Sequence, residues 1–218
     1  MRFTWFALVA IALAAPPALH AQAIGAPRRE RESRQLQLEC TSAGAALAAG
    51  RQDPRFDWAL RYITRCDETA APALAGVWRR PPRDSASLRW LADATQRVRD
   101  ERILEATLAV VRDDRRPAAT RLAAMRVLAT YANHAAYVPP GQLERGWRED
   151  TTPVLLLRGD APAIDGQRLL PPDTPERVAA TLDEVARRAS PEQVRYGARV
   201  LRVALASSQP SSSPPPRR

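Results

Sequence analysis

The sequence predicts an all-α fold of stacked helical hairpins. A five-residue phrase of the form small, apolar, Arg, bulky, aliphatic recurs at intervals close to the length of one helical hairpin. Ala, Leu, Arg and Glu dominate the composition, as expected for helices, whereas aromatic residues make up only 6% of the chain. Apolar residues in the body of the chain also recur at helical spacing. Stacked helical units build surfaces that hold other molecules rather than catalytic pockets.

The phrase occurs four times. Its copies are ALRYI at 59–63, SLRWL at 87–91, AMRVL at 124–128 and GARVL at 197–201. The first three copies begin about 28 to 37 residues apart, and the gap before the fourth is about twice as long. A fixed period in this range is typical of repeated helical units, with an interruption before the last copy.

Residues 1–23 have the features of a signal peptide. Arg2 supplies the positive charge, Phe6 to Ala15 form an apolar stretch too short to span a bilayer, and Ala21-Gln22-Ala23 fits the small-x-small cleavage rule. We therefore expect an exported protein, periplasmic or secreted, with a mature start near Ile24 and no later membrane span. Cleavage after Ala21 and an uncleaved anchor are the alternatives.

Two polar segments flank the body of the chain, which we place at residues 36–206. Residues 24–35 are rich in Arg and Glu and lack apolar periodicity, which predicts a flexible leader. Residues 207–218 are Ser, Pro and Arg in composition, which predicts a disordered tail.

The first helix pair contains both remaining cysteines. We expect helices at 36–49 and 54–66, joined by a turn at 50–53. Cys40 then lies near the start of the first helix and Cys66 at the end of the second, and these ends meet in an antiparallel hairpin. Because export permits disulfides, we predict a Cys40–Cys66 bridge; two unpaired core cysteines are the alternative.

Three further helix pairs are expected, at 67–98, 101–132 and 173–206. Pro81-Pro82 breaks the first pair, and residues 113–117 break the second. In the last pair, Asp173-x-x-Glu176 can cap one helix. Ser190-Pro191-Glu192-Gln193 matches a capping box for the other helix, with Pro191 at the first helical position.

The stretch at 133–172 fits the repeat poorly. It holds a short apolar run, Val154 to Leu157, and a second segment, Ile164 to Leu170, each of which could be a short strand. We interpret it as a degenerate repeat or an insertion packed on the helices. Long irregular insertions are often functional, so we expect specificity determinants here.

Part of the chain resembles HEAT repeats. The resemblance rests on Ile103 to Leu108, the turn at 113–117, and Arg121-Leu122-Ala123-Ala124 with Leu128. Residues 71–98 also resemble the repeat, as do residues 195–201 with a slip of one position. The resemblance covers about 36–132 and 173–206. It implies an α–α superhelix, or α-solenoid, of about four to five hairpins whose second helices line a concave face, and a scaffold or binding role without catalysis. The Arg within the phrase and the insertion depart from the family pattern.

The charge of the chain allows two interpretations. The net charge is +9, and all 33 basic residues are Arg. A helical surface laced with ion pairs is one interpretation. An anion-binding face for a polyanion, such as envelope polysaccharide, lipid headgroup or nucleic acid, is the other, although export makes a specific nucleic-acid partner unexpected.

Few residues are suited to catalysis. His134 is the only histidine after residue 23, and both cysteines are expected to be bridged, which argues against Ser-His-Asp, Cys-His and multi-histidine metal sites. No glycine-rich phosphate loop is present. We therefore expect no enzyme activity, no cofactor and no metal.

The sequence thus predicts an exported, non-catalytic helical-repeat scaffold that binds a protein partner in the cell envelope. Trp and Arg are enriched at binding hot spots. The candidate partner contacts are Trp78, Arg79, Arg80, Trp147, Arg148 and Arg158. Core packing is nevertheless the role that we expect first for each Trp, including Trp58 and Trp90. The alternative function is that of an arginine-rich module for a polyanion.

Overall fold

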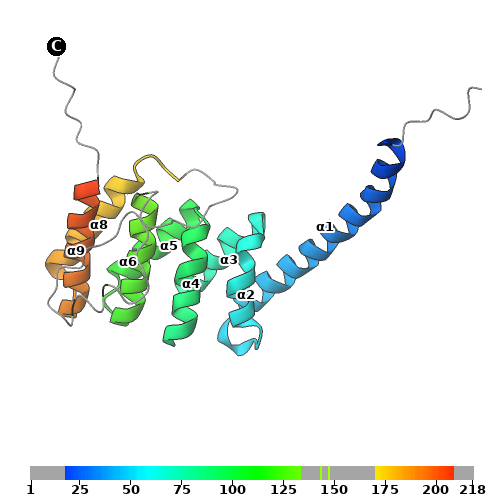
Figure 1. The fold of residues 1–218 in the computed structure, drawn as a ribbon. Helices are drawn as coiled ribbons and strands as arrows, with labels where there is room; N and C mark the ends of the chain where they lie inside the picture. Colours follow the sequence, from blue (N-terminus) through cyan, green and yellow to red (C-terminus); the bar gives the residue numbers. More distant parts are fainter. Residues whose placement is uncertain (1–17, 134–142, 144–146, 148–169, 209–218) are drawn as a thin grey trace, which may run out of the picture. The chain divides into compact units, whose positions relative to one another are not determined.

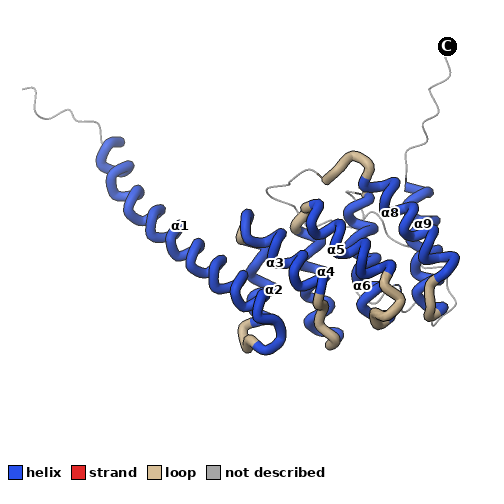
Figure 2. The backbone as a smooth tube through the Cα atoms, turned by 180° about the vertical axis from the view of Figure 1, so that it is seen from behind, coloured by secondary structure: helices blue, strands red, loops and turns tan. Residues whose placement is uncertain are grey.

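The computed structural model describes residues 18–133, 143, 147 and 170–208, which form parts of two units, residues 1–39 and residues 40–218. The regular elements of this described part are helical and include no strand, which confirms the predicted all-α class (Figure 2). The α-helices are α1 (Ala18–Ala49), α2 (Phe56–Tyr62), α3 (Asp67–Arg79), α4 (Ser85–Arg97), α5 (Glu101–Arg112), α6 (Ala118–Ala132), α8 (Thr174–Arg188) and α9 (Glu192–Ser208) (Figure 1). Short 3-10 turns occupy Gly50–Gln52 and Ile63–Arg65.

Helix α1 starts earlier than the sequence suggests. Helical backbone covers residues 24–35, where we predicted a flexible leader, and runs on without a break through the predicted start at Leu36. Residues 30–38 are exposed, so this stretch has no apolar face for periodicity to reveal. Its Arg, Glu, Gln and Leu residues are good helix formers on their own account. Residues 1–17 and 209–218 lie outside the described residues, so signal cleavage and tail disorder stay predictions.

The described helices from α2 onward pack in two rows. In the first row α2 packs on α4, α4 on α6, and α6 on α9; in the second, α3 packs on α5 and α5 on α8. Contacts of α3 with α4, α5 with α6 and α8 with α9 join the rows. Figure 1 shows α4, α6 and α9 side by side. Sequential helices therefore alternate between the rows, as in a series of hairpins.

Each copy of the repeated phrase lies on a helix of the first row, α2, α4, α6 or α9, except that Ile63 of the first copy directly follows α2. The first, second and fifth residues of the phrase are buried in all four copies. Positions i, i+1 and i+4 share one face of a helix, so these residues form the face that packs into the core. The third and fourth residues are at least partly exposed in α2, α4 and α9, but they are fully buried in α6.

Helix α6 is the centre of the core, because residues 120–131 are buried on every side. Its polar groups are bonded within the protein. Thr130 Oγ1 donates to Gln96 Oε1 at 2.8 Å, and the Tyr131 hydroxyl donates to the carbonyl of Val98. Burial raises the pKa of Tyr131, which keeps this donor protonated.

The helices that follow the 133–172 segment continue both rows directly. Helix α8 packs on α5, where Arg112 Nη2 donates to Thr181 Oγ1 at 2.7 Å and Arg112 Nε lies 3.2 Å from Glu184 Oε2. Within residues 134–169 the structure describes only Leu143, which is buried, and Trp147. The predicted strands at Val154 to Leu157 and Ile164 to Leu170 therefore lie outside the described residues, apart from Leu170.

The predicted disulfide is confirmed. Cys40 of α1 is bonded to Cys66, which directly precedes α3, with their Cα atoms 5.5 Å apart. The turn between them begins at Gly50, whose φ of 72° is the left-handed conformation that favours glycine. The second helix of this pair is shorter than predicted, because α2 ends at Tyr62 and a 3-10 turn leads to Cys66.

Helix caps differ from the predicted ones. Asp173 precedes α8 but makes no side-chain cap, and α9 begins at Glu192 rather than Pro191. The side chains that do cap helices are Asp84 and Asp100, which accept from the backbone N–H groups of Ser87 and Arg102. Each lies one residue before its helix, where a short carboxylate satisfies an otherwise unpaired N–H.

Removal of the disulfide is expected to destabilise the protein markedly. The bridge spans 26 residues of sequence, so the double variant Cys40→Ser/Cys66→Ser should lose roughly 3 to 4 kcal/mol of unfolding free energy through the freed unfolded chain. Urea unfolding of the variant and the oxidised protein measures this difference. Non-reducing mass spectrometry should find the two cysteines joined, and two alkylatable thiols in the native protein would contradict the bridge.

Two glycines should respond oppositely to alanine. A Cβ atom at Gly197 in α9 would lie 2.6 Å from Cδ2 of Leu122, a buried side chain of α6 with little room to move. Gly197→Ala should therefore lower the unfolding free energy by about 1 to 3 kcal/mol. A Cβ atom at Gly76 in α3 meets nothing within 4 Å, so Gly76→Ala should raise it by up to about 1 kcal/mol. Urea unfolding tests both, and equal changes in the two variants would refute the close approach of α9 to α6.

Candidate functional site

Aromatic and arginine side chains stack on one another over α2 and α4. The Trp58 and Tyr62 rings are stacked with centroids 5.0 Å apart and planes inclined by 21°. The Arg61 guanidinium lies 5.5 Å from the centroid of the Trp90 ring, and the Arg65 guanidinium lies 5.4 Å from that of Tyr62. Such cation–π contacts hold both partners in place. We name these five residues the arginine–aromatic face.

The position of the face follows from the repeated phrase. Arg61 is a third residue of the phrase, and Tyr62 and Trp90 are fourth residues, the positions that lie outside the buried stripe. Because α2 and α4 are neighbours in the first row, Arg61 of one helix can reach Trp90 of the other. Trp90 keeps 41% of its surface exposed, although its ring is large and apolar. Trp and Arg are enriched at protein interfaces, so a partly exposed Trp beside an Arg is typical of a binding surface.

A second group of charges adjoins the face on α4. Burial raises the pKa of the Asp93 carboxyl, and the positive charges of Arg126, Arg89 and Arg97 oppose this rise. Arg126 Nη2 of α6 lies 3.0 Å from Asp93 Oδ1. Arg89 and Arg97 are exposed. Three arginines around one carboxylate leave this side of α4 positive.

Some arginines are structural rather than available to a ligand. Arg121 of α6 is 1% exposed, and its Nε donates to the carbonyl of Val111 at the end of α5 at 2.9 Å. Its Nη1 donates to the carbonyl of Ser190 at 2.8 Å and lies 2.7 Å from Asp114 Oδ1. A guanidinium with several fixed donors suits this role, because the last carbonyls of a helix have no partner within it.

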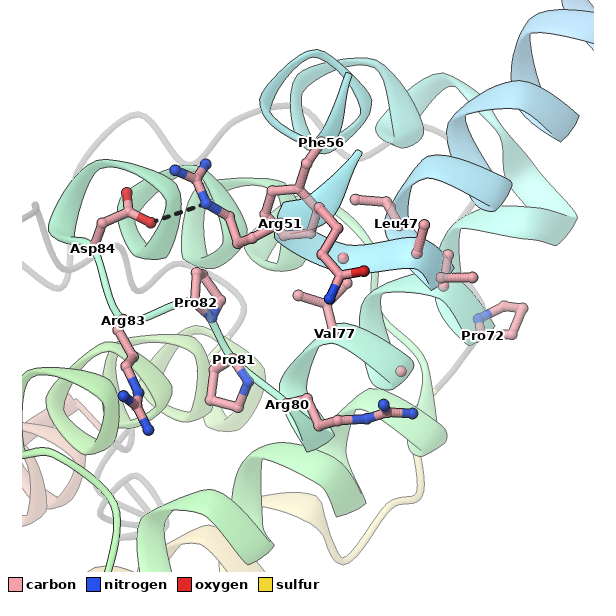
Figure 3. A pocket seen from close by; sticks show the side chains of 16 residues that line it. Leu47, Arg51, Phe56, Pro72, Val77, Arg80, Pro81, Pro82, Arg83 and Asp84 are labelled. Carbon is pink, nitrogen blue, oxygen red and sulfur yellow. Dashed lines mark ion pairs between the residues drawn. The ribbon is translucent and has the colours of Figure 1, made fainter. Parts of the chain in front are cut away.

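A cavity with a volume of about 690 Å³ opens between the end of α1, the Gly50–Gln52 turn, α3 and the loop at 80–84 (Figure 3). The buried side chains of Leu47, Phe56 and Val77 contribute to its apolar lining. Arg51, Gln52, Arg80, Arg83 and Asp84 are its polar lining residues. The remaining lining residues are Ala48, Ala49, Gly50, Pro72, Ala73, Gly76, Pro81 and Pro82.

The cavity exists because α3 presents small residues to it. Pro72, Ala73 and Gly76 lie at i, i+1 and i+4, so they share one face of the helix. In a helix interior, Gly is about 1 kcal/mol and Pro about 3 kcal/mol less favourable than Ala. Packing does not require glycine at position 76, because a Cβ atom there meets nothing within 4 Å. Gly and Pro on this face therefore weaken α3, but the small residues there leave space for the cavity.

Some of the charged side chains that line the cavity form ion pairs with other described residues, and others do not. Arg51 lies 3.4 Å from Asp84 Oδ2, the contact drawn in Figure 3, and 2.9 Å from Asp57 Oδ1. It also donates to Ser87 Oγ at 2.8 Å. Arg80 and Arg83 are exposed and form no ion pair with another described residue. The cavity thus carries excess positive charge.

The predicted partner contacts are only partly at the surface. Trp78 is 0% exposed, so its assignment as a partner contact is wrong: the ring packs between the rows, and its Nε1 donates to Thr95 Oγ1 at 2.9 Å. Arg79 and Arg80 are exposed, and Arg80 lines the cavity. Trp147 is half-buried, with its ring edge-on to Tyr196 at 5.7 Å between centroids. Arg148 and Arg158 lie outside the described residues.

Sequence reasoning missed the arginine–aromatic face. We expected Trp90 to pack in the core, whereas the structure exposes it. The position of each residue within the repeated phrase is the signal that could have predicted this face. The third and fourth residues lie off the i, i+1, i+4 stripe, so large side chains there point away from the core unless a further helix covers them.

The described part of the chain contains no group of three or more His, Cys, Asp and Glu residues placed to hold a metal ion. Both cysteines are in the disulfide, and His134 lies outside the described residues. None of the described helices is long and apolar enough to cross a membrane.

No protein-family model, curated protein or solved structure matches the chain. The likeness to HEAT repeats therefore stays an interpretation of the sequence. The arginine–aromatic face and the cavity are the two candidate sites among the described residues.

The structural role of Arg121 predicts a large effect on stability. Arg121→Met should lower the unfolding free energy by about 1 to 3 kcal/mol, because it leaves the buried carbonyl of Val111 and the carbonyl of Ser190 without their donor. Arg199→Met, at an exposed position of α9, is the control and should change it by less than about 0.5 kcal/mol. Urea unfolding gives both values. Similar stabilities for the two variants would show that Arg121 is dispensable.

Proposed function

We propose that the protein is an exported, non-catalytic scaffold of HEAT-like helical repeats that binds a protein partner in the cell envelope. The arginine–aromatic face is the observation that carries the proposal. It combines Trp, Tyr and Arg, the residue types that dominate binding hot spots. Its rings and guanidiniums already hold one another, so less side-chain freedom is lost when a partner binds.

The arrangement of the helices supports the scaffold role. Copies of one phrase occupy successive helices of a single row, which is the pattern expected if each hairpin is one repeat of an α-solenoid. In such a solenoid the second helices line the concave surface. The arginine–aromatic face lies on two of these helices, α2 and α4, and would be part of that surface.

The charges on the face indicate the nature of the partner segment. Arg61, Arg65, Arg89 and Arg97 are exposed, whereas Asp93 is close to Arg126 and Asp57 is close to Arg51. A segment that offers carboxylates together with an apolar side chain complements the arginines and the exposed Trp90 ring at once. A polyanion without apolar groups would use the arginines alone.

This difference defines the experiment. Binding that buries the Trp90 ring should survive high salt, whereas purely charge-driven binding to a polyanion weakens steeply with salt. We expect cross-linked pull-downs from the native envelope to recover one protein at both low and high salt. The variants Trp90→Ala and Arg61→Gln/Arg65→Gln should each reduce the recovered amount at least tenfold, since hot-spot truncations of this kind cost about 2 kcal/mol or more.

Exposed arginines elsewhere provide a matched control. Arg187→Gln/Arg188→Gln removes the same charge from the end of α8, in the other row, and should leave recovery unchanged. Circular dichroism should show equally folded variants, because the altered side chains are exposed. Recovery of polyanions alone, with complete loss at high salt, would replace the scaffold function with polyanion binding.

A further inference from the structure

We infer that the cavity lined by Gly76 is a binding site for a linear apolar chain that ends in a carboxylate, as in a medium-chain fatty acid. The site is built from other residues than the arginine–aromatic face and does not depend on the proposed function. It joins an apolar lining to excess positive charge in one hollow.

The lining selects for an apolar chain. Leu47, Phe56 and Val77 are buried there, and alanine and proline residues supply much of the rest. Among the lining side chains, only those of Gln52, the three arginines and Asp84 are polar. A peptide backbone in this space would bury N–H and carbonyl groups with few partners, which is unfavourable, whereas a hydrocarbon chain has none to satisfy. The volume of about 690 Å³ is in the range of small-molecule sites.

The charges select for an anionic end group. Three arginines line the cavity against one carboxylate, and that carboxylate, of Asp84, is already close to Arg51. Arg80 and Arg83 form no ion pair with another described residue, and both belong to the loop at 80–84 that lines the cavity. The planar guanidinium matches a carboxylate with two parallel N–H donors. Figure 3 shows the two guanidiniums directed away from each other, so either of them, rather than both together, is assigned to the carboxylate.

The helix that forms one wall supports a binding role. Gly76 and Pro72 weaken α3, yet no neighbouring atom requires glycine at position 76. A larger side chain there would meet open space, and Gly76 itself lines the cavity. We therefore interpret Gly76 as a residue that keeps the cavity open.

The test is isothermal titration calorimetry of the purified full-length protein with decanoate. We expect one saturable site in the wild type. Gly76→Phe, which places a ring in the cavity, should abolish binding while the thermal midpoint is retained, and Gly76→Ala should still bind. Arg80→Gln/Arg83→Gln should weaken binding at least tenfold, as expected for lost charge-assisted hydrogen bonds. Arg79→Gln, at an exposed neighbour that does not line the cavity, should bind as the wild type does.

Two further ligands identify the groups that are recognised. Decanol has the same chain without the charge and should bind at least tenfold more weakly than decanoate. A short apolar peptide with a free carboxylate should also bind more weakly. No saturable binding of decanoate to the wild type, or undiminished binding to Gly76→Phe, would overturn the site. Equal binding of decanol would overturn the role of the arginines, and tighter binding of the peptide would overturn the choice of chain. The pull-down variants lie outside the cavity, so failure of either proposal is visible separately.

Discussion

Helix α6 is buried on all sides, and this constraint positions much of the second unit. A helix without a solvent-facing side must bond each of its polar groups inside the protein, because an unpaired buried group is costly. Arg121 bonds to the end of α5 and to the turn before α9, whereas Arg126 and Thr130 bond to side chains of α4. The polar side chains of α6 thus contact both rows. The two rows therefore meet at α6, and its hydrogen bonds restrict the positions of the neighbouring helices.

The sequence predicted the helical class, most helix pairs and the disulfide, since each rests on local periodicity or on the ends of one hairpin. It could not predict which side chains the neighbouring helices cover. Arg126 and Arg61 occupy the same position of the phrase, yet one is buried by flanking helices and the other is exposed. For this reason Trp78, a candidate partner contact, is buried between the rows, whereas Trp90, which we expected in the core, is 41% exposed. The cavity was also hidden, because it arises where three segments meet around small residues of α3.

The arginines fall into two groups in the structure, although the composition alone does not distinguish them. Arg112, Arg177 and Arg202 join helices through Glu184, Glu105 and Asp183, and Arg121 and Arg126 are buried in α6. The first three residues support the interpretation of a surface laced with ion pairs. The other group lies within α2 to α4, where Arg61 and Arg65 lie over aromatic rings and Arg80 and Arg83 lie beside an apolar cavity. Charge next to exposed apolar surface favours ligands that carry both features, rather than a uniform polyanion.

Both candidate sites are built on the hairpin that the disulfide closes and on the helices next to it. In the first row, α2 has a described neighbour, α4, on one side only, so its outer residues are not covered in the way that those of α6 are. An end position of this kind leaves side chains free for binding, but it also removes the packing that would hold a short helix in place. The Cys40–Cys66 bond compensates for this loss, because it ties α1 at Cys40 to the residue that precedes α3, and α2 lies between them in the sequence. A covalent tie restricts local opening without covering any surface. The same bond that stabilises the hairpin therefore keeps the face and the cavity ordered before a ligand arrives, which lowers the entropic cost of binding.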